Sequence, residues 1–251
     1  MPRMPFLSKA ADAFLLPARD LLRGLDRCLG SGCRGLGRVA LGLLAAWWLY
    51  VPVHEILHAG ACLAAGGKVT RLEIAPLYGG GLLARIVPFV VPGGRYAGRL
   101  SGFDTRGSDL IYLATDLGPF LLTVPGVWAL RRAARACRPF LFGAALPFAL
   151  APFLSLTGDA YEIGSLLVTR LPPWSAAPVK GLLRGDDLFR QASALAAQGA
   201  AAPWAGLILA AALGALWAFL TYGLAGGLAT LCGAEPVAGA SPAEADERTP
   251  R

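Results

Sequence analysis

The sequence predicts a mainly α-helical membrane protein with about four kinked spans and a short β-hairpin inserted after the first span. Of its 251 residues, 55% are hydrophobic and only 16% are charged, against roughly 25% charged residues in an ordinary soluble domain. The apolar residues form long blocks rather than periodic stripes, which is typical of helices that cross a bilayer. The 32 glycines and 19 prolines are frequent enough to kink such helices.

Composition also excludes several classes of protein. The net charge of +7 is not gathered into a basic stripe with interleaved aromatic residues, so we expect no nucleic-acid partner. The five cysteines are odd in number and form no CxxC pair, which argues against a disulfide framework or a zinc ribbon. The partner that the composition indicates is the lipid bilayer, and the oligomeric state stays open.

The chain begins with a basic arm over residues 1–37, in which Ala11–Leu29 has the pattern of an amphipathic helix. This helix could lie at the membrane interface or form a cap in the cytosol. The first apolar run follows from Val39 to about Ala65, and its 27 residues would span roughly 40 Å as a helix. That length exceeds the roughly 30 Å of the hydrocarbon core, so this run predicts the first span.

A hairpin is predicted over residues 68–87, directly after the first span. Residues 68–74 alternate between the two faces of a strand, Gly79–Gly81 supply a turn, and residues 82–87 supply the second strand. Pro88 and Pro92 limit how far this second strand can extend.

Three further apolar runs predict the remaining spans. They cover 110–130, with breaks at Gly118, Pro119 and Pro125; 139–168, with kinks at Pro147 and Pro152; and 204–231, where Gly223 and Gly227 have the GxxxG spacing of a packing face. We therefore divide the chain into the arm, a core over 38–170, a polar connection with the last helix over 171–232, and a disordered tail over 233–251. The basic residues favour a cytoplasmic N-terminus by a small margin only, so the orientation stays open.

The first span carries the sequence His54-Glu55-Ile56-Leu57-His58, which is an H-E-x-x-H motif. Residues i and i+4 share one face of a helix, so both imidazoles can bind one Zn²⁺, with Glu55 beside its open position. The alternative is a pair of core histidines. It is weaker, because His and ionised Glu are costly in hydrocarbon and normally mark a function.

A catalytic zinc ion usually has a third protein ligand, which must here be acidic or a cysteine because the chain has only two histidines. Our first choice is Asp159, which follows a kinked apolar run and a glycine. Glu162, one turn later, could assist or replace it, and Asp116 fits better as a partner for an imidazole N–H. An ion pair or a helix cap is the alternative for Asp116 and Glu162. A Cys62 thiolate is conceivable, although a buried thiol is commoner.

The order of these features resembles the site-2 protease family of intramembrane zinc metalloproteases. The shared features are the H-E-x-x-H helix, a glycine and a short β-ribbon, a helix with Gly118-Pro119, and a third helix with an acidic residue, over roughly residues 38–170. The resemblance implies that His54, His58 and Asp159 bind Zn²⁺ and that Glu55 activates water. It also implies a metal near the cytosolic side, which would place the N-terminal arm outside, against the charge distribution.

The sequence departs from this family in its later motif, where the family has an Asn, a Pro and then Leu-Asp-Gly. Residues 155–162 read Ser-Leu-Thr-Gly-Asp-Ala-Tyr-Glu, and the chain contains no Asn. The role of that Asn in orienting substrate would be missing here or would pass to Thr157 or Tyr161.

We therefore expect a zinc-dependent endopeptidase that cuts a peptide bond in or near a membrane-spanning segment of another protein. Its place would be an integral, multi-pass position in a prokaryotic-type inner membrane, and the hairpin would either hold unwound substrate by edge pairing or serve as a connector. Two alternatives stay open. One is a non-catalytic membrane scaffold with a zinc-stabilised core, and the other is a cation transporter that uses Asp116, Asp159 and Glu162.

Overall fold

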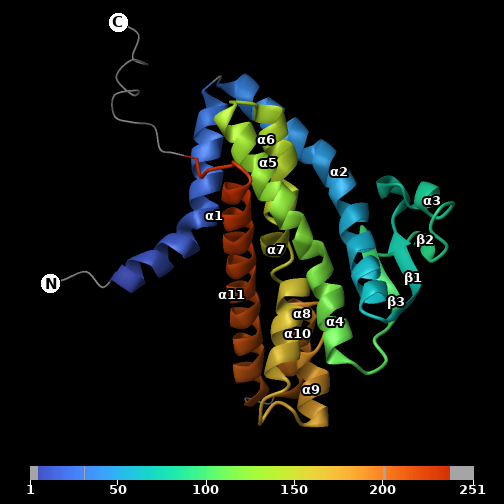
Figure 1. Cartoon of the computed structure of the whole chain (residues 1–251). Coiled ribbons are helices and arrows are strands. Elements are labelled where there is room, and N and C mark those ends of the chain that lie inside the picture. The colour runs from blue at the N-terminus through green and yellow to red at the C-terminus, as the bar shows by residue number, and fades with distance from the viewer. Residues whose placement is uncertain (1–4, 31, 200–201, 238–251) are drawn as a thin grey trace, which may run out of the picture.

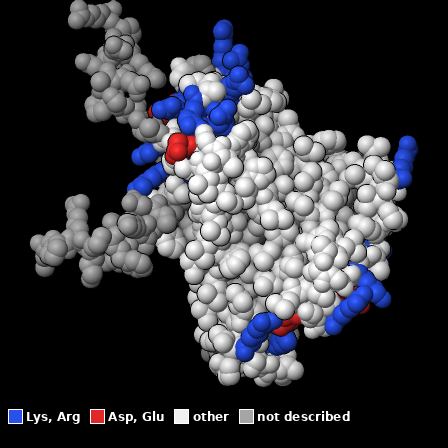
Figure 2. All heavy atoms as spheres, in the orientation of Figure 1, with Lys and Arg blue, Asp and Glu red and all other residues white. Residues whose placement is uncertain are grey.

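The computed structural model describes residues 5–30, 32–199 and 202–237, which are mainly helical with one small sheet (Figure 1). Three helical segments are long and apolar enough to cross a membrane: Cys33–Ala64, Asp109–Arg135 and Pro203–Leu231. Figure 2 shows charged side chains on this face near the top, near the bottom and along the right-hand margin, with a broad area of uncharged atoms between them. This distribution suits a membrane protein, because charged side chains are costly inside the hydrocarbon layer.

The elements have the following bounds. The helices are α1 (Pro5–Leu29), α2 (Cys33–Ala64), α3 (Gly80–Leu83), α4 (Asp109–Leu117), α5 (Thr123–Arg135), α6 (Pro139–Ala149), α7 (Ala151–Leu154), α8 (Asp159–Val168), α9 (Ala177–Leu183), α10 (Leu188–Gln198) and α11 (Ala202–Leu231), with 3-10 helices η1 (Pro76–Tyr78) and η2 (Gly118–Leu122). The strands are β1 (Lys68–Ile74), β2 (Val90–Pro92) and β3 (Gly98–Asp104).

The break predicted at Gly118 and Pro119 is present as η2, which joins α4 to α5. Here the chain passes very close to α2: a Cβ atom on Gly118 would lie 2.5 Å from the carbonyl oxygen of Leu57. Only a glycine allows this approach, since real Cβ atoms do not come so close to a backbone oxygen. The contact holds α4 beside the turn of α2 that carries the H-E-x-x-H motif.

The third apolar run is broken into α6, α7 and α8, which pack on different partners. Helix α6 lies against α2 and α5, and α8 lies against α11. Glycines make both contacts close: a Cβ on Gly143 would lie 2.0 Å from the Val39 oxygen, and one on Gly164 would lie 2.0 Å from the Ala210 oxygen. The break between α7 and α8 is what brings the start of α8 inside the molecule.

The predicted packing face at Gly223 and Gly227 is not used within the described chain. A Cβ atom on either glycine would meet nothing within 4 Å. Helix α11 approaches α8 through Gly214 instead, where a Cβ atom would lie 2.2 Å from the Ala160 oxygen. The GxxxG spacing therefore does not predict which face of α11 packs within this chain, because α8 contacts the face that carries Gly214.

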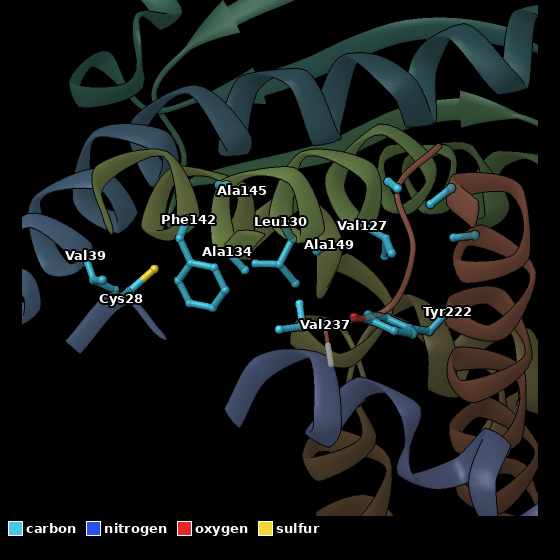
Figure 3. Close-up of a cluster of buried hydrophobic side chains, with 14 residues drawn as sticks. Cys28, Val39, Val127, Leu130, Ala134, Phe142, Ala145, Ala149, Tyr222 and Val237 are labelled. Atoms are coloured by element: carbon cyan, nitrogen blue, oxygen red, sulfur yellow. The ribbon is translucent and has the colours of Figure 1, made fainter. Parts of the chain in front are cut away.

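The largest buried apolar cluster joins α1, α2, α5, α6 and α11 near the end of the molecule where the first and last helices meet. Figure 3 shows Phe142 and Leu130 pointing into this cluster. Val237 belongs to the cluster as well, so the first residues after α11 pack against the core. The disorder predicted for 233–251 is thus wrong for 233–237, and residues 238–251 lie outside the described part.

The predicted hairpin over 68–87 is wrong in its second half. Residues 82–87 do not form a strand: Gly79 turns the chain at a φ of 81°, α3 begins at Gly80, and the Val87 N–H bonds to the Leu83 carbonyl as in a helical turn. Apolar side chains of this segment cover the sheet instead of extending it. The real partners of β1 come later in the chain, as β2, which is parallel to it, and β3, which is antiparallel.

The sheet order is β2-β1-β3, so β3 forms one edge. The polar connection after α8 contains the two short helices α9 and α10, whose apolar side chains pack with α11 in a second buried cluster. Local pattern did not predict these helices. They close the end of the molecule at which α8 ends.

Candidate metal centre

Helix α2 presents the two histidines on one face, as the motif predicts. The Nε2 atoms of His54 and His58 lie 3.2 Å apart, and their ring centroids are separated by 4.8 Å. Residues four apart on a helix lie one turn above each other, which explains this geometry from the sequence alone. Both rings are largely shielded from solvent, with side-chain exposures of 11% and 9%.

Asp159 reaches the same point from α8. Its Oδ2 atom lies 3.2 Å from His54 Nε2, and its Oδ1 atom lies 3.4 Å from His58 Nε2. Asp159 is the first residue of α8, where the N-terminus of a helix favours a negative charge. Ligand atoms of these three residues all lie within 4.8 Å of one another, so the chain contains a candidate metal-binding triad.

The donor set of this triad fits a zinc ion. His58 Nδ1 lies 2.8 Å from the Thr115 carbonyl oxygen, and an N–H donated there leaves the Nε2 lone pair free to face His54 and Asp159. Two imidazole nitrogens and one carboxylate oxygen form a ligand set of the kind that catalytic zinc sites use, with a fourth position left open. The match between this site and a zinc ion therefore depends on two imidazole nitrogens and one carboxylate oxygen lying close together.

The group that lies within hydrogen-bond distance of the His58 ring is not the one that the sequence predicts. Asp116 was expected to receive an imidazole N–H, but the structure places the backbone oxygen of Thr115 there, and Asp116 Oδ2 has no hydrogen-bond partner among the described residues. On the other ring, His54 Nδ1 also has no hydrogen-bond partner there, while the Tyr50 ring lies 5.2 Å from the His54 ring.

Glu55 lies on α2 beside the triad and contacts the sheet. A Cβ atom on Gly98 would lie 2.3 Å from Glu55 Cγ, so the backbone of β3 passes directly against this side chain. Leu100, two residues further along β3, lines the same cavity as Glu55. Strand β3 thus fixes the Glu55 side chain next to the two histidines.

A cavity of about 390 Å³ opens beside the triad. Its wall combines Glu55, His58 and Asp159 with the backbone of β3 and with acidic residues of α4, α8 and the α9–α10 connection. A cavity of this size can hold part of a small ligand or of a peptide. Two residues of the triad, His58 and Asp159, therefore border this cavity.

The other predicted site residues lie in different surroundings. Glu162 is not one of the residues of the triad; its carboxylate accepts a hydrogen bond from the Tyr112 hydroxyl. Tyr161 is fully buried, and its hydroxyl donates to the Leu183 carbonyl at 2.6 Å. Thr157 is exposed, and its carbonyl accepts from the Leu188 N–H. Neither Thr157 nor Tyr161 lines the cavity, so substrate orientation by these two side chains finds no support here.

Sequence reasoning missed two contributors to the cavity. One is β3, whose residues 98–101 form part of the wall. The other is Tyr112, which lies four residues before Asp116 and so shares its face of α4. That spacing was a signal available in the sequence, whereas the position of β3 depends on how the sheet pairs.

Neither a protein-family model, nor a curated protein, nor a solved structure matches this chain. The resemblance to intramembrane metalloproteases therefore depends on the motif and on the order of the features around it in the sequence.

Proposed function

We propose that this chain is a zinc-dependent intramembrane endopeptidase. The observation that carries the proposal is the convergence of His54, His58 and Asp159, with Glu55 beside them at a cavity. A purely structural metal site needs neither an adjacent carboxylate nor an access path, because its four positions are closed by protein ligands. The resemblance to the site-2 protease family implies the same roles, with His54, His58 and Asp159 as metal ligands and Glu55 as the residue that activates water.

The metal would be held by the two Nε2 atoms and the Asp159 carboxylate. Bound there, Zn²⁺ supplies Lewis acidity toward a water molecule and a scissile carbonyl group. The Glu55 carboxylate takes a proton from the attacking water and returns it to the leaving amine nitrogen, which makes it the general base and then the general acid. The close approach of β3 at Gly98 would keep Glu55 oriented for both transfers.

The substrate would be a membrane-spanning segment that unwinds into an extended strand. Strand β3 is an edge of the sheet and lines the cavity, so its outer backbone groups are available for pairing with such a strand. An extended substrate beside β3 would pass next to Glu55. In this proposal β3 takes the role first considered for the hairpin.

We place the protein as a multi-pass integral protein of an inner-type membrane, with α6 to α8 as a broken fourth crossing. The break between α7 and α8 would be compatible with a membrane because backbone groups there are bonded within the protein: the Thr157 carbonyl accepts from the Leu188 N–H, and the Ser155 carbonyl accepts from the Gly158 N–H. Water can then reach the metal centre through the polar connection between α8 and α11.

The test compares wild type with Glu55→Gln in a host membrane, reading new peptide termini by mass spectrometry and zinc content by elemental analysis. We expect Glu55→Gln to keep its zinc and to lose cleavage by at least about 100-fold, as expected for loss of a general base. Glu73→Gln is the matched control, since Glu73 pairs with Arg71 on β1 and lies outside the cavity.

Cleavage that persists in Glu55→Gln would remove the general-base role. Zinc binding without any cleavage by wild type would leave the scaffold alternative. Ion flux that survives replacement of both histidines would favour the transporter.

A further inference from the structure

The cavity beside the metal centre has a second acidic region that the proposed zinc chemistry does not use. Asp116 on α4 and Glu162 on α8 both line the cavity and are almost fully buried, with exposures of 3% and 6%. Neither residue belongs to the candidate metal triad. The two carboxylates therefore need another explanation.

Their hydrogen bonding is incomplete. Among the described residues, Asp116 Oδ2 has no hydrogen-bond partner, and the one side-chain donor to Glu162 is the Tyr112 hydroxyl. A buried carboxylate without partners carries a large desolvation cost, and proteins normally offset it with a cation or with several donors. An unpartnered buried oxygen at a cavity wall thus points to a partner that arrives in the cavity.

The cations of the chain itself do not fill this role. Two arginines line the cavity, Arg99 and Arg190. Arg99 Nη2 is engaged by Asp186 Oδ2 at 2.8 Å, and both side chains are over 40% exposed, which places this pair at the solvent side of the cavity. No ion pair to Asp116 or Glu162 is found among residues 5–30, 32–199 and 202–237.

We propose that Asp116 and Glu162 form an acidic subsite that binds the ammonium or guanidinium group of a Lys or Arg side chain in the substrate. This inference rests on the proposed protease function and names the substrate class: a membrane segment with a basic residue close to the scissile bond. The cavity is shared by this subsite and by Glu55, so a peptide whose backbone lies at Glu55 can place a side chain at Asp116.

The absence of a second ligand cluster from the described part of the chain favours a basic side chain over a second metal ion. A divalent cation needs several ligand atoms at one point, and the described residues contain no second cluster of this kind around Asp116. The cavity also continues from the acidic floor to a polar mouth at Asp186 and Asp187, outside the three long apolar segments. A cationic side chain can enter from that side without crossing hydrocarbon.

The test uses synthetic membrane-spanning peptides in liposomes, identical except for one position that carries Lys or norleucine and is moved along the peptide. We expect wild type to prefer the Lys peptide by about 10- to 100-fold in kcat/KM at one position, the effect of a charge-assisted hydrogen bond. In Asp116→Asn combined with Glu162→Gln, the preference should fall toward one. Glu73→Gln, which replaces a carboxylate on β1 outside the cavity, should keep it.

The wild-type ratio decides the proposal even if the double variant does not fold. Equal cleavage of both peptides at every position overturns the subsite and leaves the protease intact. Equilibrium binding of both peptides to zinc-loaded Glu55→Gln separates the acidic subsite from the protease function. If this variant binds the Lys peptide more tightly while wild type cleaves neither peptide, the subsite is supported and the protease function is overturned. Equal binding, or no binding, together with no cleavage overturns both.

Zinc content measured on the same samples tests whether Asp116 and Glu162 bind a second metal ion instead. A wild type that binds two zinc ions, with one lost in the double variant, would mean that Asp116 and Glu162 hold a second metal and would overturn the basic-residue subsite. We expect one zinc ion per chain in both proteins.

Discussion

Two carboxylates of α8, Asp159 and Glu162, lie on the same side of the helix but face different partners. Asp159 lies within 3.4 Å of both histidines, whereas the Glu162 carboxylate bonds to Tyr112. The sequence could place both near the motif, because each lies in the second half of the third apolar run, 139–168. It could not decide which one faces the metal, since that depends on the rotation of α8 set by its packing on α11.

We therefore predict that Asp159→Ala lowers zinc affinity by on the order of 100-fold or more. The loss of a ligand should exceed the 10- to 100-fold cost of losing a residue that only supports a ligand. Glu162→Gln should retain zinc, which makes it the matched control on the same helix. Competition with a chromophoric chelator measures both affinities, and a larger loss in Glu162→Gln would mean that the third ligand has been assigned wrongly.

At the level of elements, local patterns predicted the helices better than the sheet. The helical period of 3.6 residues places both histidines of the motif on one face of α2, whatever the rest of the chain does. The residues that pair with β1 lie 18 or more positions away along the chain, as Val90 does from Leu72. The sequence therefore predicts the nearer segment 82–87 as the antiparallel partner, whereas that partner is β3. The close helix–helix contacts at glycines could likewise not be predicted from the sequence, because the spacing of residues does not show which face of a helix packs against its neighbour.

The glycines give a test at this scale. Gly143→Ala should destabilise the protein by about 1–3 kcal/mol, because a Cβ atom there would lie 2.0 Å from the Val39 oxygen and must push α6 away from α2. Gly227→Ala should be neutral or stabilising by up to about 1 kcal/mol, since nothing lies within 4 Å and alanine favours a helix. Unfolding in detergent micelles measures both. A loss in Gly227→Ala would mean that the GxxxG face is packed after all.

The whole molecule is held together at one end by a buried charge network. Arg131 on α5 is 1% exposed and donates to Asp20 on α1, to the Gly226 carbonyl on α11 and to the Ala234 carbonyl after it. Tyr222 donates to the same Asp20 carboxylate. One guanidinium thus links the N-terminal helix, the second span and the C-terminal segment, although these segments are far apart in sequence.

We predict that Asp20→Asn costs about 3–5 kcal/mol in the free energy of unfolding, because it leaves the buried Arg131 without a counter-charge. Glu73→Gln, which removes an ion pair whose Arg71 side chain is 56% exposed, should cost no more than about 1 kcal/mol. If Asp20→Asn behaved like Glu73→Gln, the network would not hold α1 to the spans. Replacing Arg131 by Met in the Asp20→Asn background should recover part of the loss, because it removes the uncompensated charge that causes it.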